Sequence, residues 1–98
     1  NVDHCGLPLR VSEMLAQIPG TAYVERVAVH SPNAVRRAKK AIRKGFEYQL
    51  AEKGFSLIEV LSTCPTGWGM SPVDAILWLE NNMIPYYPLG VFKAPEEA

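Results

Sequence analysis

The chain has 98 residues, enough for one modest domain or for part of a larger one. Its 48% hydrophobic and 20% charged residues are ordinary for a packed globular segment. Lysine and arginine together number 10, and aspartate and glutamate together also number 10. The balance excludes a net positive charge that would attract the chain to nucleic acid or to a membrane surface. No apolar run approaches the roughly 18 residues of a membrane span, and no signal peptide pattern opens the sequence. The two cysteines form no disulfide framework, which favours a reducing, cytoplasmic setting.

The first half of the sequence predicts a helix, a strand and a long helix. Residues 9–18 predict a short helix, and the β-branched and aromatic residues of 23–29 predict a strand. Ser31 is a typical N-cap and is followed by a proline, so a second helix begins there. Its apolar side chains recur at three- and four-residue spacing, which predicts a helix over 32–53 with Gly54 as its stop.

The second half predicts another strand and another helix. Residues 55–62 predict a second strand whose apolar side chains do not alternate with polar ones apart from Glu59, a pattern typical of a parallel strand covered on both faces. Ser71 is the N-cap of a helix that we expect to fail before Pro85. The prolines of the segment 85–98 predict an irregular tail.

Strand, helix and strand in this order form a βαβ unit of the α/β class with parallel strands. Its right-handed crossover places the loop at 30–31 and the loop at 63–70 on one edge of the sheet. Two parallel strands cover themselves poorly, so we expect further strands from sequence absent here. Because Asn1 is not an initiator methionine, we expect residues 1–98 to be an incomplete portion of a larger domain.

The loop after the second strand carries the strongest functional signal. In open parallel sheets, ligands bind outside the carboxyl ends of the strands, and Cys64 follows such an end. A thiolate there could be a nucleophile or a metal ligand, and Gly67 and Gly69 would let the backbone approach a cofactor closely. A structural cysteine explains the same residue. Because an iron–sulfur cluster needs about four thiolates, the chain cannot hold one alone.

The histidines and the charges within the strands carry weaker signals. His4 and His30 lack zinc-site spacing to the cysteines, so we interpret them as residues of surface turns. Glu25, Arg26 and Glu59 fall inside predicted strands, where a buried carboxylate needs a partner. We expect one glutamate to pair with Arg26, or with a residue of a missing strand.

The long helix bears a cluster of basic residues. Arg36, Lys40, Arg43 and Lys44 share one face at three- and four-residue spacing, adjoined by Glu47. This face could dock an acidic protein or an anionic ligand, or it could simply be a solvated helix surface.

Four stretches carry a recognisable family pattern, namely residues 20–32, 39–42, 55–70 and 82–93. The most specific part is the Cys-Pro-Thr-Gly-Trp-Gly-Met run that begins at Cys64. Together the stretches resemble the β subunit of 2-oxoacid:ferredoxin oxidoreductases, and most closely the 2-oxoglutarate and branched-chain 2-oxoacid types. The chain then corresponds to the C-terminal part of a doubly wound, thiamine-diphosphate-binding domain.

This resemblance implies oxidative decarboxylation of a 2-oxoacid with coenzyme A, giving acyl-CoA, carbon dioxide and reduced ferredoxin. It implies thiamine diphosphate with magnesium for the carbanion chemistry and iron–sulfur clusters for the electrons. The position of Cys64 matches the fourth ligand of the cluster nearest the thiamine, with Gly67 and Gly69 shaping the loop around it.

The same resemblance implies that the chain is inactive alone and binds no cofactor alone. The other three cluster ligands and the Gly-Asp-Gly motif that holds magnesium diphosphate are absent from this sequence. Its expected partners are therefore the remaining subunit sequence, other oxidoreductase subunits and ferredoxin. The alternative function is a non-catalytic interaction module that docks an acidic protein through the basic face of helix 32–53.

Overall fold

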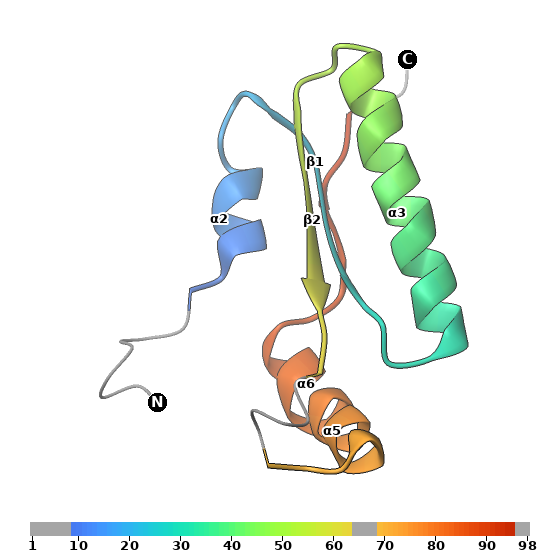
Figure 1. Cartoon of the computed structure of the whole chain (residues 1–98). Helices are drawn as coiled ribbons and strands as arrows, with labels where there is room; N and C mark the ends of the chain where they lie inside the picture. Colours follow the sequence, from blue (N-terminus) through green and yellow to red (C-terminus); the bar gives the residue numbers. More distant parts are fainter. Residues whose placement is uncertain (1–8, 64–68, 96–98) are drawn as a thin grey trace.

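The computed structural model describes residues 9–63 and 69–95, which form a three-stranded mixed sheet with helices on both faces (Figure 1). The strand order is β2-β1-β3. The central strand β1 (Thr21–Ala28) pairs in parallel with β2 (Phe55–Leu61) and antiparallel with β3 (Gly90–Lys93). The predicted α/β class with a parallel βαβ unit is confirmed.

The helices form two layers and a cap. The short helix α2 (Val11–Ala16) packs on one face of the sheet, and α3 (Pro32–Leu50) packs on the other (Figure 1). A helical run lies beyond the carboxyl ends of β1 and β2 and consists of α5 (Pro72–Trp78), the π-helix η1 (Leu79–Met83) and α6 (Ile84–Tyr86). None of the helices in the described ranges has the length and apolarity needed to cross a bilayer.

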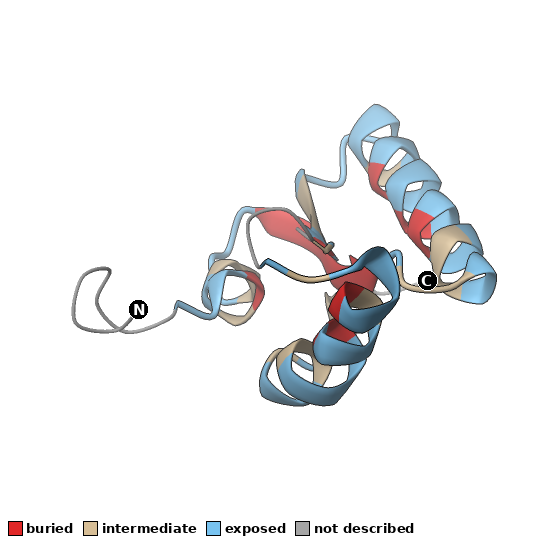
Figure 2. Ribbon diagram, turned by 60° about the horizontal axis from the view of Figure 1, so that its bottom comes forward, coloured by how far each residue is buried: buried red, intermediate tan, exposed pale blue. Residues whose placement is uncertain are grey.

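The core is centred on β1, whose eight residues are all buried (Figure 2). On the α3 side, Val27 packs against Ala38 and Ala41, small residues that let the helix approach the sheet closely. At the carboxyl end, Ala28 packs with Leu79 of the cap. The central strand is thus shielded by both layers and by the cap.

Both predicted serine N-caps are confirmed. Ser31 Oγ accepts a hydrogen bond from the Ala34 N–H at 3.1 Å, and Ser71 Oγ accepts one from the Asp74 N–H at 3.2 Å. Each serine satisfies a backbone donor that the first helical turn leaves open. The two caps fix the starting points of α3 and α5.

The end of α3 differs from the sequence prediction. The helix ends at Leu50, because Glu52 adopts a left-handed φ of 58° and the Lys53 N–H donates to the Tyr48 carbonyl. This arrangement is a Schellman-type C-cap, a position usually taken by glycine. Gly54 is therefore not the stop, although its φ of 135° also favours glycine.

The prediction that the last helix fails before Pro85 was wrong. The helical backbone continues through this proline to Tyr86. Just before it, the Ile84 N–H donates to the Leu79 carbonyl, five residues back, in the widened π turn. Because a proline clashes with the carbonyl four residues back in a regular α-helix, the wider turn accommodates its ring.

The prediction of an irregular tail over 85–98 was wrong for Gly90–Lys93, which form β3. Pro85 and Pro88 precede this four-residue strand, Pro95 follows it and none lies within it, so its ladder donors remain. One of the expected further strands thus comes from the chain itself. The predicted cover on both faces of β2 is also absent among the described residues, since Leu61 alone is buried in that strand.

Candidate functional site

The loops expected to carry function leave the sheet at one edge. Because β1 and β2 are parallel with Ala28 opposite Leu61, the residues that follow both strands start side by side. This confirms the predicted edge for the described flanks, with His30 following β1. The predicted cluster ligand Cys64 and the predicted loop residue Gly67 lie outside the described residues, as do His4 and Cys5.

Of the three site residues predicted in this loop, Cys64, Gly67 and Gly69, only Gly69 lies in the described part of the chain. It is exposed and adopts a left-handed φ of 67°, two residues before the N-cap Ser71. No atom lies within 4 Å of the place that a Cβ would occupy. The turn geometry alone therefore accounts for a glycine here, and its predicted role beside a cofactor stays a prediction.

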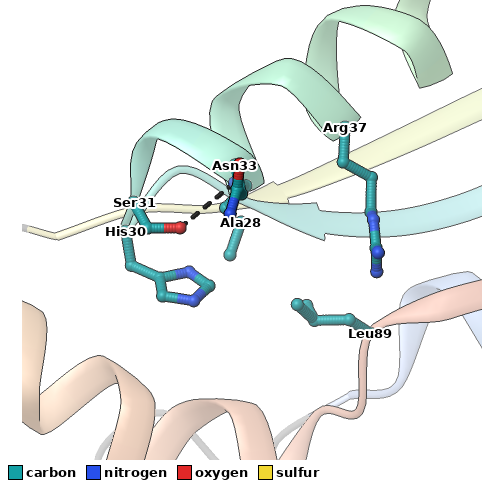
Figure 3. A pocket seen from close by; sticks show the side chains of 7 residues that line it. Ala28, His30, Ser31, Asn33, Arg37 and Leu89 are labelled. Carbon is teal, nitrogen blue, oxygen red and sulfur yellow. Dashed lines mark hydrogen bonds between the residues drawn. The ribbon is translucent and has the colours of Figure 1, made fainter.

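A pocket of about 210 Å³ opens at the same sheet edge, and we call it the sheet-edge pocket. Its lining consists of Ala28, His30, Ser31, Asn33, Ala34, Arg37 and Leu89. Figure 3 shows the His30 ring, the Arg37 side chain and Leu89 around this space. The end of β1, the first turns of α3 and the segment before β3 thus converge here.

His30 is the titratable group nearest the strand ends. Its Nε2 lies 3.9 Å from Glu80 Oε2 on η1, and its buried Nδ1 has no hydrogen-bond partner in the described part of the chain. Arg37 supplies a guanidinium to the other side of the pocket. Across residues 9–63 and 69–95, no group of three or more histidine, cysteine, aspartate or glutamate residues could hold a metal ion.

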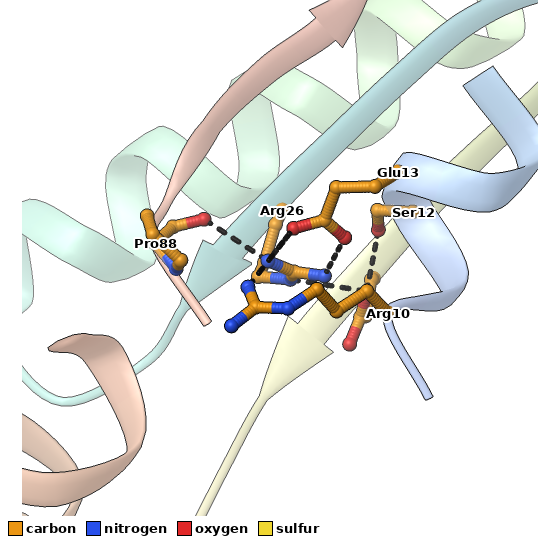
Figure 4. A network of polar contacts seen from close by, with 6 residues as sticks. Arg10, Ser12, Glu13, Arg26 and Pro88 are labelled. Carbon is orange, nitrogen blue, oxygen red and sulfur yellow. Dashed lines mark hydrogen bonds and ion pairs between the residues drawn. The ribbon is translucent and has the colours of Figure 1, made fainter. Parts of the chain in front are cut away.

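The predicted partnership of Arg26 with a strand glutamate is confirmed (Figure 4). Arg26 Nε donates to Glu59 Oε1 at 3.1 Å, and its two terminal nitrogens donate to Glu13 at 3.0 and 2.6 Å. A fourth hydrogen bond reaches the Pro88 carbonyl at 3.2 Å, and Ser12 donates its hydroxyl to Glu59. One buried side chain therefore ties β1 to α2, β2 and the segment before β3.

The charges of this network balance. Burial opposes the charged form of Arg26, but its hydrogen bonds with Glu13 and Glu59 outweigh burial and raise its pKa. The hydrogen bond from Arg26 lowers the pKa of Glu13, which Arg10 also approaches at 3.6 Å. The buried Arg26 and the half-exposed Arg10 face the partly buried carboxylates of Glu13 and Glu59, and this balance of charge indicates a structural role.

Sequence reasoning missed Glu13 and left Glu25 and Glu59 as equal candidates, of which the structure pairs Glu59 with Arg26. A signal for a second acceptor existed, because a buried guanidinium offers five donors and one carboxylate cannot satisfy them all. The other strand carboxylate, Glu25, accepts a hydrogen bond from Tyr23. Burial and this hydrogen bond raise the pKa of Tyr23.

The basic face of α3 is exposed to solvent. Its cations Arg36, Lys40, Arg43 and Lys44 are exposed, as is Glu47. Arg36 bonds to Asn33 within the same helix, and none of the four cations takes part in an ion pair among the described residues. The structure therefore leaves this face open to a partner or to solvent.

The sequence is similar to subunits of two enzymes. It is 33% identical to ketoisovalerate oxidoreductase subunit VorA of Methanothermobacter thermautotrophicus over 90 residues, 92% of this chain and 19% of that protein. It is 38% identical to 2-oxoglutarate synthase subunit KorB of Methanocaldococcus jannaschii over 76 residues, 71% of this chain and 25% of that protein. No family model matches the chain, and no solved structure matches it significantly. The chain thus spans a fifth to a quarter of these relatives, and the similarities support a 2-oxoacid oxidoreductase subunit family.

Proposed function

We propose that this chain is a segment of the β-type subunit of a 2-oxoacid:ferredoxin oxidoreductase. The complete enzyme would decarboxylate a 2-oxoacid oxidatively, transfer the acyl group to coenzyme A and reduce ferredoxin. The observation that carries this proposal is the similarity to VorA over 92% of the chain. The parallel ends of β1 and β2 support it, because cofactors bind at such an edge.

Cys64 is the residue of this chain proposed to hold a cofactor. Its thiolate suits one iron of an iron–sulfur cluster, which would carry electrons away from the thiamine diphosphate and magnesium centre. Cys64 would be one of about four thiolate ligands that a cluster takes. The sequence contains only two cysteines, so this chain cannot supply the full set. The other ligands and the residues that bind thiamine diphosphate would come from the rest of the enzyme, so we propose that the chain is inactive alone.

The contribution of the chain's own residues would be to fix the two ends of the 64–68 segment. At its start, Leu61 is buried against Leu79, and Glu59 is bonded to Arg26. At its end, Ser71 caps α5. Both flanks are thus held by packing and hydrogen bonds, and the cytoplasm is the proposed setting because ligation needs reduced thiols.

In the test, this chain replaces the matched segment of M. thermautotrophicus VorA. We call the resulting protein the VorA chimera. It is produced without oxygen with the other subunits of that enzyme, and its iron content and 2-oxoacid-dependent dye reduction are measured. Cys64→Ala should remove one cluster's iron and abolish dye reduction, whereas the control Cys5→Ala should retain both. Full iron occupancy in Cys64→Ala would overturn the ligand assignment.

The exposed basic face of α3 favours a second candidate function, docking of an acidic protein such as ferredoxin. The paired charge reversals Arg36→Glu and Lys40→Glu should abolish binding of an acidic ferredoxin in calorimetry, and added salt should weaken the wild-type interaction. Lys53→Glu, an exposed charge change beyond the end of the helix, serves as the control. If the doubly charge-reversed variant still bound ferredoxin and added salt did not weaken the wild-type interaction, this function would be ruled out.

A further inference from the structure

Arg37 lines two neighbouring hollows near the start of α3. One is the sheet-edge pocket. The other, which we call the basic groove, measures about 480 Å³ and is lined by Asn33, Arg36, Arg37 and Lys40. Asn33 and Arg37 line both, so the two hollows meet at these side chains. The basic groove alone falls within the range of about 300–1,000 Å³ that small-molecule sites occupy.

The basic groove is positively charged. Arg36, Arg37 and Lys40 are exposed, and no ion pair within the described ranges involves them. The described residues that line the groove include no carboxylate. A guanidinium binds phosphate oxygens in a bidentate manner, and a lysine adds a point charge. Three cations around one hollow therefore suit a phosphoryl group, whose charge is larger than that of a single carboxylate.

The sheet-edge pocket offers a different surface. Ala28, Ala34 and Leu89 give it apolar walls. His30 Nδ1 is buried and has no hydrogen-bond partner among the described residues, whereas Nε2 of the same ring faces Glu80 at 3.9 Å. A neutral ring that carries its proton on Nε2 leaves Nδ1 as an acceptor. The pocket therefore suits a ligand part that is largely apolar and donates one hydrogen bond.

We propose that the two hollows together bind a phosphorylated small molecule. Its phosphoryl group lies in the basic groove, and its body lies in the sheet-edge pocket and donates a hydrogen bond to His30 Nδ1. Arg37 lies between the two parts, because it lines both hollows and extends toward the segment that carries Leu89 (Figure 3). A nucleotide has this composition, because its phosphates are joined to a flat base that can carry an amino group.

Two other occupants fit less well. An inorganic phosphate ion would meet the cations of the basic groove and leave the apolar walls and His30 Nδ1 without a contact. An acidic protein would meet the exposed cations of α3, but a protein surface does not reach the buried Nδ1. The inference goes beyond the proposed function and does not rest on it.

The test titrates the 98-residue chain with magnesium-free ADP, adenosine and inorganic phosphate in calorimetry at constant ionic strength. We expect ADP to bind at least tenfold more tightly than adenosine or phosphate, because only ADP fills both hollows. Arg37→Met should weaken ADP binding at least tenfold, and His30→Phe should weaken it at least threefold. Arg43→Met is the matched control and should leave the affinity unchanged, since Arg43 is an exposed arginine of α3 that lines neither hollow.

Four outcomes would overturn the inference. They are an absence of ADP binding at millimolar concentration, phosphate binding as tight as ADP binding, unchanged affinity in His30→Phe, and equal losses in Arg37→Met and Arg43→Met. Because Arg37 is exposed, its replacement decides the test even if His30→Phe is destabilised, and circular dichroism checks the fold of each variant. The inference and the proposed function fail separately, because the iron content of the VorA chimera reads Cys64 and the ADP titration reads the two hollows.

Discussion

Arg26 on β1 donates two hydrogen bonds to Glu13 on α2, at 3.0 Å to Oε2 and 2.6 Å to Oε1. The same guanidinium donates to Glu59 of β2. Replacing Arg26 therefore leaves two carboxylates without their arginine partner. Removing one partner of a fully buried ion network costs about 3–5 kcal/mol, and the partial exposure of both carboxylates places this network toward the lower end, still a large share of the stability of a small domain. Arg26→Met should lower the free energy of unfolding by this amount in urea titrations followed by circular dichroism.

The matched control for that prediction is Arg10→Met. Arg10 is a half-exposed cation at 3.6 Å from Glu13, and exposed pairs contribute at most about 1 kcal/mol. Equal losses in the two variants would show that burial of the Arg26 network contributes nothing beyond a surface ion pair.

The Arg26–Glu13 contact also predicts how stability depends on pH. The hydrogen bond from Arg26 lowers the pKa of Glu13, so the folded state binds this proton less readily than the unfolded state. Its stabilisation is fully present above about pH 4.3, the ordinary glutamate value, and is lost as pH falls through the lowered pKa. Urea titrations from pH 7 to pH 3 should show this loss, and Glu13→Gln should make it smaller.

A matched variant for the pH series is Glu47→Gln, which removes an exposed carboxyl group on α3. It should retain the wild-type decline in stability at low pH. If Glu13→Gln and Glu47→Gln gave the same curve, the decline would reflect general protonation and not the contact with Arg26.

Local signals were sufficient to predict much of the fold. The N-caps Ser31 and Ser71 were predictable because a serine before a proline presets both the cap and the first helical turn. That Arg26 would pair with a glutamate of the strands was also predictable, because charges inside a strand must find partners, but the choice of Glu59 over Glu25 was not. These features depend on neighbouring residues or on the rule that buried charges are paired.

Features that depend on distant contacts were not predictable in the same way. Gly90–Lys93 form a strand because β1 offers them an antiparallel edge, and a four-residue segment among prolines carries little signal of its own. Leu89, which lines the sheet-edge pocket, lies directly before that strand. Glu13 reaches Arg26 across a packing interface between α2 and the sheet, and sequence spacing does not encode that interface.

The C-cap of α3 contains a position that glycine should improve. Glu52 adopts a φ of 58°, and a side chain in the left-handed region costs about 1–2 kcal/mol. Glycine removes this strain, although its greater freedom in the unfolded chain offsets part of the gain. Glu52→Gly should raise the free energy of unfolding by about 0.5–1 kcal/mol in urea titrations. A loss of stability would show that the Glu52 side chain contributes more than its backbone strain.

Two glycines with positive φ should respond differently to alanine. At Gly54, φ is 135° and an added Cβ would lie 2.7 Å from the Gly20 carbonyl oxygen, which also accepts the Phe55 N–H at 3.1 Å. At Gly69, φ is 67° and the space is empty, so alanine meets backbone strain alone. Gly69→Ala should cost about 1–2 kcal/mol, and Gly54→Ala should cost more, because the clash also displaces the turn that starts β2. Both variants are measured by thermal and urea unfolding. If Gly54→Ala and Gly69→Ala lost the same stability, the clash at Gly54 would be contradicted, and only the cost of a left-handed backbone, which both positions share, would remain.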